Sequence, residues 1–122
     1  MISSITLNRI TNNKKLSSLN YYLFLVTVPN IEEGQKIAKI LVETKLAACV
    51  NIIQNIISIY RWKGKIEEDN EHLLLIKTTE ENSIKIIQKV KEIHSYTEPE
   101  CIGLKIEKGS ETYLDWIKEV VE

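Results

Sequence analysis

The residues best suited to metal chemistry in this chain are His94 and Glu100, which lie a few positions apart ahead of Cys101. Imidazole, thiolate and carboxylate groups are the usual ligands of copper and zinc, which take three or four of them. One chain supplies few such groups here, so a copper or other divalent-cation site would gather ligands near a boundary between subunits. The alternative is that His94 only ends a helix, where partial positive charge suits the helix dipole.

Catalysis is not predicted. A nucleophilic pair would need Cys49 or Cys101 within hydrogen-bond reach of His72 or His94, with a third group to orient the histidine. The sequence contains no nucleophile elbow, phosphate-binding loop or paired-carboxylate motif. Cys49 lies in an apolar segment typical of a small core residue. Because neither cysteine has CxxC spacing, free thiols in a reducing compartment are favoured over a disulfide.

A second group of side chains suits a small-ligand cleft or an interface between subunits. Ser58, Tyr60 and Trp62 alternate along one apolar segment, so they share one face if the segment is a strand. Lys77, near the end of the next apolar run, offers a cation. Aromatic rings with one polar end favour a cleft between subunits. Simple interface packing explains Tyr60 and Trp62 equally well.

These side chains belong to a long β-hairpin predicted over residues 47–78. Apolar residues fill a first limb that ends at Trp62 and a second limb at Leu73–Ile76, while Lys63–Lys65 and Glu67–Asn70 supply turn chemistry. The first limb would run about 14 residues, against roughly 5 or 6 for a usual strand. Because an uncovered apolar hairpin promotes association, we expect a partner subunit to cover it and Trp62 to dock there.

The other elements complete an α+β fold. The pattern predicts strands over Tyr21–Val28 and Ile102–Ile106 and a C-terminal helix over Tyr113–Val121. A helix is predicted from its cap at Asn30 and Glu33 through about Leu46. Another helix is predicted to begin at Thr79–Asn82, with Ile84, Ile87 and Val90 on its apolar face. This order predicts a ferredoxin-like split βαβ sandwich with an extra C-terminal helix. Two helices would cover one face of the sheet, so another copy of the sheet is the simplest cover for the other.

Length and charge exclude several classes of protein. The 122 residues fit one domain, and a net charge of −1 argues against nucleic acid as an obligate partner. No apolar run is long enough to span a membrane. Residues 1–20 contain Arg9, Lys14 and Lys15 but no acid. We expect them to form a flexible tail on a domain of residues 21–122 in a cytoplasmic protein, although their composition also resembles an organellar transit peptide.

Six segments, in fixed order, resemble the CutA family of divalent-cation tolerance proteins: TVPN, KLAACVNI, SIYRWKGKI, LLLIKT, HSYTEPE and YLDWI. The resemblance runs from about Tyr22 to Ile117. It implies a ferredoxin-like subunit in a tight homotrimer formed by strand pairing, with an architecture like that of PII signal transducers. It also implies a role in tolerance of copper or other divalent metal ions, with a metal ion or small ligand bound at intersubunit clefts. The alternative is a PII-like signalling or assembly scaffold with no direct metal role.

The resembling motifs extend the set of candidate site residues. They add Cys49, Tyr96, Tyr113 and Trp116 to the predicted cleft or interface. Three positions differ from the family pattern. Ser95 stands where the family commonly has proline, which fixes the backbone. Val26 and Ile93 stand where a cysteine and a histidine have been proposed as copper ligands in the family, so that only His94 of that set is present.

Overall fold

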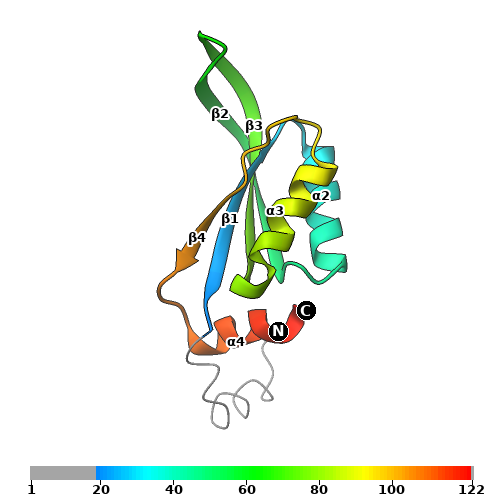
Figure 1. Ribbon diagram of the computed structural model, residues 1–122, viewed down its shortest axis with the longest axis vertical. Coiled ribbons are helices and arrows are strands. Elements are labelled where there is room, and N and C mark those ends of the chain that lie inside the picture. The colour runs from blue at the N-terminus through cyan, green and yellow to red at the C-terminus, as the bar shows by residue number, and fades with distance from the viewer. Residues whose placement is uncertain (1–18, 122) are drawn as a thin grey trace.

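The computed structural model describes residues 19–121, so the predicted tail lies outside the described residues except for Leu19 and Asn20. The elements are β1 (Tyr21–Val28), α2 (Ile31–Glu43), β2 (Cys49–Trp62), β3 (Lys65–Thr79), a short 3-10 helix η2 (Glu80–Asn82), α3 (Ser83–Ile93), β4 (Ile102–Ile106) and α4 (Glu111–Val120). The strands form one antiparallel sheet in the order β2-β3-β1-β4. This is the predicted ferredoxin-like arrangement, with α2 and α3 side by side against the sheet (Figure 1).

The core lies between these two helices and the sheet. Phe24, Val26 and Val28 alternate on the covered face of β1, and each is at most 2% exposed. They pack with residues of β3 and of both helices in one cluster, which includes Leu74, Ile76, Ile37, Leu41, Ile86 and Val90. Burying each aliphatic side chain contributes about 1.5–3 kcal/mol, so this cluster holds the two helices on the sheet.

The apolar face predicted for α3 is correct at Val90 and wrong at Ile84 and Ile87. Ile84 and Ile87 are 65% and 41% exposed, whereas Ile86 and Val90 are buried. The helix carries apolar residues on more than one side, so the i, i+4 spacing from Ile86 fits the sequence as well as the i, i+3 spacing from Ile84. The orientation of the helix on the sheet decides between them, and the short pattern does not encode that orientation.

The helix starts are only partly as predicted. The Asn30 side chain caps α2 by accepting a hydrogen bond from the Glu33 N–H at 2.8 Å. Neither Thr79 nor Asn82 makes a side-chain cap hydrogen bond at the start of its helix. Helix α2 ends at Glu43, before the predicted Leu46, because Lys45 adopts a left-handed φ of 61° and breaks the helical backbone.

The hairpin of β2 and β3 projects beyond the body of the molecule (Figure 1). It turns at Lys63 and Gly64, whose φ values of 50° and 80° fit a two-residue hairpin turn. The segment Glu67–Asn70, predicted as part of the turn, instead belongs to β3 and pairs with β2. Its charged side chains are tolerated because the projecting arm is largely solvent-exposed, and backbone pairing with β2 outweighs their low strand propensity.

A β-bulge interrupts the hairpin between Ile53 and Ile56. Asn55 supplies the left-handed conformation that this bulge needs, with φ of 60°. Its N–H donates a hydrogen bond to Nδ1 of His72 at 3.2 Å, which fixes the bulge to the facing strand.

The sheet face opposite α2 and α3 carries an open apolar surface. Its central row runs across all four strands through Asn51, Leu75, Leu25 and Ile102, and Leu23 and Leu104 form the next pair. Ile102 and Leu104 are each 52% exposed. At one end, α4 packs Ile117 and its neighbours against Tyr21 and Ala48. We refer to Leu23, Leu25, Leu75, Ile102 and Leu104 as the open face.

Gly103 on β4 is predicted to tolerate no side chain. A Cβ atom there would lie 2.6 Å from Cε2 and 2.7 Å from Cζ of Phe24, which is only 2% exposed. Gly103→Ala should therefore lower the free energy of unfolding by about 1–3 kcal/mol through overpacking, measured by urea denaturation. In a Phe24→Leu background the same change should cost less, since the colliding ring is gone. Equal costs in both backgrounds would contradict the explanation.

Candidate functional site

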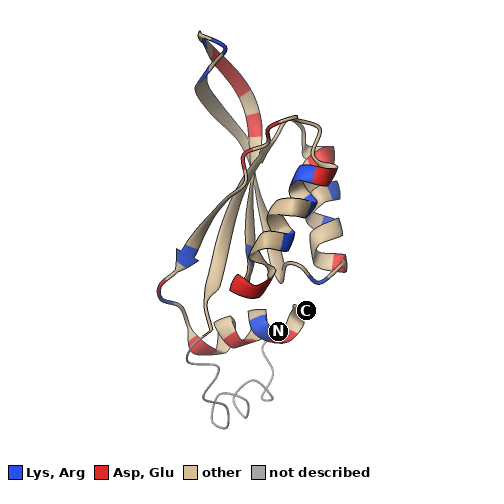
Figure 2. Ribbon diagram, in the orientation of Figure 1, with Lys and Arg blue, Asp and Glu red and all other residues tan. Residues whose placement is uncertain are grey.

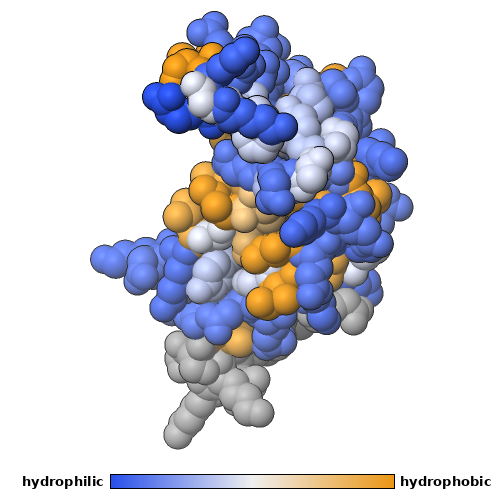
Figure 3. Space-filling view, turned by 45° about the horizontal axis from the view of Figure 1, so that its top comes forward, coloured by the Kyte–Doolittle hydropathy of each residue, from blue (hydrophilic) through white to orange (hydrophobic). Residues whose placement is uncertain are grey.

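A pocket of about 740 Å³ opens where the hairpin, the end of β1 and the loop from α3 to β4 meet. It is lined by Thr27, Ser58, Ile59, Tyr60, Trp62, Glu71, Ser95, Tyr96, Thr97, Glu98 and Glu100. Five of the predicted site residues, Ser58, Tyr60, Trp62, Tyr96 and Glu100, therefore come together in one chain. The hairpin tip overhangs the body of the molecule, and apolar side chains gather beneath it (Figure 3).

The other four predicted cleft residues form a separate group, at the end of the sheet near α4. Lys77 pairs across the strands with Cys49, and its Nζ lies 6.0 Å from the Tyr113 ring centroid. The rings of Tyr113 and Trp116 are 5.4 Å apart. Within one chain, the cleft predicted from the sequence is thus divided between the two ends of the open face.

Two tyrosines in the pocket donate hydrogen bonds to carboxylates. The Tyr96 hydroxyl donates to Oε2 of Glu71 at 2.9 Å, and the Tyr60 hydroxyl donates to Asp69. The hydrogen bond to Asp69 raises the pKa of Tyr60 to about 12. Burial and the bond to Glu71 raise the pKa of Tyr96 further above its usual range. Both phenols are therefore protonated donors at neutral pH.

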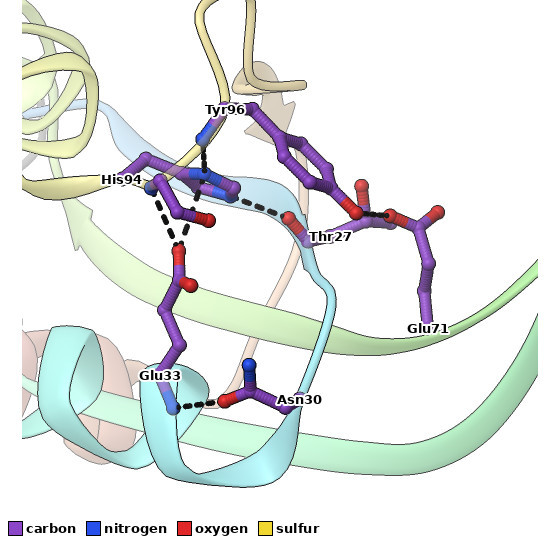
Figure 4. A network of polar contacts seen from close by, with 7 residues as sticks. Thr27, Asn30, Glu33, Glu71, His94 and Tyr96 are labelled. Atoms are coloured by element: carbon purple, nitrogen blue, oxygen red, sulfur yellow. Dashed lines mark hydrogen bonds and ion pairs between the residues drawn. The ribbon is translucent and has the colours of Figure 1, made fainter.

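His94 fixes the loop that carries Tyr96 (Figure 4). Nε2 of His94 lies 2.7 Å from the Thr27 carbonyl oxygen, and Nδ1 accepts a hydrogen bond from the Tyr96 N–H at 3.0 Å. A carbonyl can only accept, so the contact with Thr27 places the proton on Nε2. Glu33 approaches the same ring at 3.3 Å from Nδ1 and also accepts from the Ser95 N–H at 2.9 Å. The imidazole thus joins β1, α2 and the loop.

This arrangement bears directly on metal binding. Both ring nitrogens of His94 already have partners, so a metal ion would displace one of these hydrogen bonds. Among residues 19–121, no three or more histidine, cysteine, aspartate or glutamate side chains gather closely enough to hold a metal ion. Metal ligation by His94 and Glu100 stays a prediction, and it requires ligands from more than one chain.

Glu71 and Thr27 were not identified from the sequence, and Glu33 was assigned a different role. Glu71 ends the acidic segment EEDNE two residues before the apolar run LLLIKT, and this position at the boundary is a signal that could have marked it. The sequence pattern did single out Glu33, but as a capping-box residue, whereas its carboxylate contacts His94 and the Ser95 N–H instead. Thr27 takes part through its backbone carbonyl, which no side-chain pattern can indicate.

Glu100 should make stability weakly dependent on pH. Burial, followed by the charge of Glu71, raises the pKa of Glu100 above its ordinary value. Its ionised form therefore opposes folding at neutral pH, and this penalty disappears as the pH falls through the raised pKa. Glu100→Gln should be more stable than the parent at pH 7 by a few tenths of a kcal/mol, since the residue is largely exposed.

The measurement is thermal unfolding of both proteins between neutral and acidic pH. The difference in melting temperature should shrink as Glu100 becomes protonated. Glu68→Gln, on the exposed arm outside the pocket lining, controls for the loss of one negative charge. A Glu100→Gln protein that is less stable than the parent at pH 7 would contradict this role.

Comparison with known proteins settles the family. The family model described as CutA1 divalent ion tolerance protein matches residues 22–120. The chain belongs to the CutA1 family. It is 52% identical over 95 residues to the divalent-cation tolerance protein CutA of Thermus thermophilus, an alignment that covers 78% of this chain and 92% of that protein. It is 45% identical over 107 residues to the chloroplastic protein CutA of Arabidopsis thaliana, covering 88% of this chain but 57% of the relative.

Solved CutA1 structures share the fold. The crystal structure of CutA1 from Oryza sativa superposes with a TM-score of 0.83 at 42% identity, covering 85% of this chain and 95% of that chain. The divalent cation tolerance protein from Thermus thermophilus gives 0.82 at 48% identity, covering 84% and 99%. The region matched by the CutA1 family model includes every residue that lines the pocket. No helix within residues 19–121 is long and apolar enough to cross a membrane.

Proposed function

We propose that the protein acts in tolerance of divalent metal ions as a CutA1 homotrimer, with a metal ion or small ligand bound at clefts between subunits. The names of its relatives support the general role, since the Thermus thermophilus and Archaeoglobus fulgidus proteins are both called divalent-cation tolerance proteins. The observation that carries the binding role is the pocket, which brings three carboxylates and three aromatic rings together under the hairpin.

Two features of the sheet support self-association. The open face presents half-buried leucines and exposed Ile102 and Leu104 on one side of all four strands. In addition, β2 and β4 are the outer strands of the sheet, so each has one edge without a strand partner among the described residues. Exposed apolar faces and free strand edges are surfaces that natural proteins cover. A second and third copy of the chain would cover both.

The metal part of the proposal assigns His94 and Glu100 as candidate ligands of Cu²⁺ or another divalent cation. Glu100 lines the pocket, whereas His94 must give up its hydrogen bond with Thr27 or Tyr96 to bind. In a trimer each ligand is present in three copies, which is how a sparse set could reach the coordination number of copper or zinc. No catalytic reaction forms part of this proposal.

Native mass spectrometry of the full chain with Cu²⁺ or Zn²⁺ titrated in tests assembly and metal binding together. Three times the chain mass and a stoichiometric bound ion are the expected results. A stable monomer at micromolar concentration would overturn the trimer. A trimer that binds no metal ion at stoichiometric concentration would favour the second candidate, a PII-like signalling or assembly scaffold, which the fully partnered His94 ring supports.

The cellular location belongs to the same proposal. Both cysteines are free, which suits a reducing compartment such as the cytoplasm. The name of the Arabidopsis thaliana relative, chloroplastic, supports the alternative that residues 1–20 direct the chain to an organelle. Fluorescence microscopy of fusions with and without residues 1–20 distinguishes the two locations.

A further inference from the structure

The pocket is acidic and contains no basic side chain. Glu71, Glu98 and Glu100 line it, and no lysine, arginine or histidine is among the lining residues. The basic residues of the hairpin, Arg61, Lys63 and Lys65, lie at its tip, while the acids lie below them along β3 (Figure 2). In the part of the chain that the structure describes, none of the three lining carboxylates forms an ion pair. A ligand for this pocket is therefore expected to be positively charged.

Glu71 is the pocket residue best placed to bind a cation. It is only 6% exposed, and the Tyr96 hydroxyl satisfies one of its carboxylate oxygens. Within residues 19–121 the other oxygen, Oε1, has no hydrogen-bond or ion-pair partner, and the residue lines the pocket. A cationic hydrogen-bond donor in the pocket can therefore bind this oxygen of Glu71 in a charge-assisted hydrogen bond.

The walls of the pocket favour an organic cation over a bare metal ion. Tyr60, Trp62 and Tyr96 supply aromatic rings, whose faces attract ammonium and guanidinium groups. Within the chain, Nζ of Lys63 lies 5.8 Å from the Trp62 ring centroid, a distance at which a cation–π contact is possible. A volume of about 740 Å³ is in the range of sites for small organic molecules.

We propose that this pocket binds an organic cation, a primary ammonium or guanidinium group on a short apolar stem. The charged group donates hydrogen bonds to Glu71 and lies near Glu100, and the stem packs against Tyr60 and Trp62. The inference rests on the ligand-binding role proposed above and specifies the chemical class of the ligand. Two sources share this chemistry, a free small amine and a lysine or arginine side chain of a peptide.

Tryptophan fluorescence provides the test, with agmatine as the probe in a Trp116→Phe protein. Trp116 lies on α4 outside the pocket, so this change leaves Trp62 as the only reporter. Saturable quenching or enhancement by agmatine is expected, and butylurea, a neutral compound of similar length, should bind at least about tenfold more weakly. Nα-acetylarginine amide is the second probe. Tighter binding of agmatine identifies a free amine as the source, and tighter binding of the capped arginine identifies a side chain.

Matched variants connect the binding to the carboxylates. Glu71→Gln should weaken agmatine binding about tenfold or more, and Glu100→Gln should weaken it less, while Glu68→Gln on the exposed arm should leave it unchanged. Circular dichroism of each variant verifies folding, and Glu100→Gln carries the test if Glu71→Gln fails to fold.

Lack of binding by both cationic probes would overturn the inference, as would equal binding of agmatine by the parent and the variants of the lining carboxylates. Equal binding of butylurea and agmatine would do the same. These results are independent of the mass-spectrometric test of trimer and metal binding. A trimer that binds Cu²⁺ but no agmatine refutes this inference alone.

Discussion

A single charge on the open face, introduced by Leu75→Glu, is expected to convert the proposed trimer into a folded monomer. Leu75 is half-buried and lies between Asn51 on β2 and Leu25 on β1 in the central row of the sheet. If another copy covers this row, the new carboxylate is buried without a partner. Such a charge costs about 3–5 kcal/mol in each subunit, which is enough to shift assembly by orders of magnitude in concentration.

Ile84→Glu is the matched control for this experiment. It makes a similar apolar-to-acid change on α3, where Ile84 is 65% exposed on the side away from the core. Sedimentation equilibrium over a dilution series should give three times the chain mass for the parent and Ile84→Glu, and one chain mass for Leu75→Glu. Far-UV circular dichroism should be the same for all three. A Leu75→Glu protein that remains trimeric at the lowest concentration would exclude the open face as the interface.

His94→Ala is expected to lower the free energy of unfolding by about 2–4 kcal/mol. The change removes a buried ring and leaves the Thr27 carbonyl and the Tyr96 N–H without the partners seen here. It also frees the loop that holds the Tyr96 hydroxyl against Glu71. His94→Gln should cost less, since its amide can still donate to Thr27. Urea denaturation monitored by circular dichroism measures each change.

His72→Ala serves as the comparison for His94→Ala. His72 is half-buried and accepts one hydrogen bond, from the exposed backbone of Asn55. Its loss should cost about 0.5–1.5 kcal/mol, less than the loss of His94. If His94→Ala is as stable as the parent, the network of Figure 4 does not hold the loop. Because the predicted cost is large, Cu²⁺ binding by His94→Ala is interpretable only after its folding has been verified.

Local patterns in the sequence predicted most of the fold. The apolar run of β1 and the alternation in β4 gave strands with the observed bounds, Tyr21–Val28 and Ile102–Ile106. The Asn30 cap marked the start of α2. These signals are local, since each depends on residues within one element. The phase of α3 and the extension of β3 through Glu67–Asn70 were missed because both depend on packing or pairing with a distant segment.

The candidate site was predictable only in part for the same reason. Alternation placed Ser58, Tyr60 and Trp62 on one face, and all three line the pocket. The contacts that build the rest of the site join residues far apart in the chain. His94 meets Thr27 across 67 positions, and Tyr96 meets Glu71 across 25. Such pairs carry no spacing signal in a single sequence, so the role of His94 as the anchor of the loop becomes visible only in the folded chain.

The bulge at Asn55 determines which side chains of β2 reach the pocket. Before the bulge, Ile53 lies opposite Leu73; after it, Ile56 lies opposite Glu71, so β2 uses one residue more than β3. The odd-numbered residues of β2 therefore share the face of Leu75 before the bulge, and the even-numbered ones share it afterwards.

β2 therefore contains two segments whose alternation of side chains differs in phase by one residue, and the bulge joins them. If β2 instead kept a single alternation through Asn55, with no bulge, Tyr60 and Trp62 would turn to the other face, and Ile59 and Arg61 would share the face of Glu71. A guanidinium of the chain itself would then stand where the pocket now has aromatic rings. The identity of the pocket walls thus depends on the bulge, which absorbs one residue of β2, as well as on which residues the strand contains.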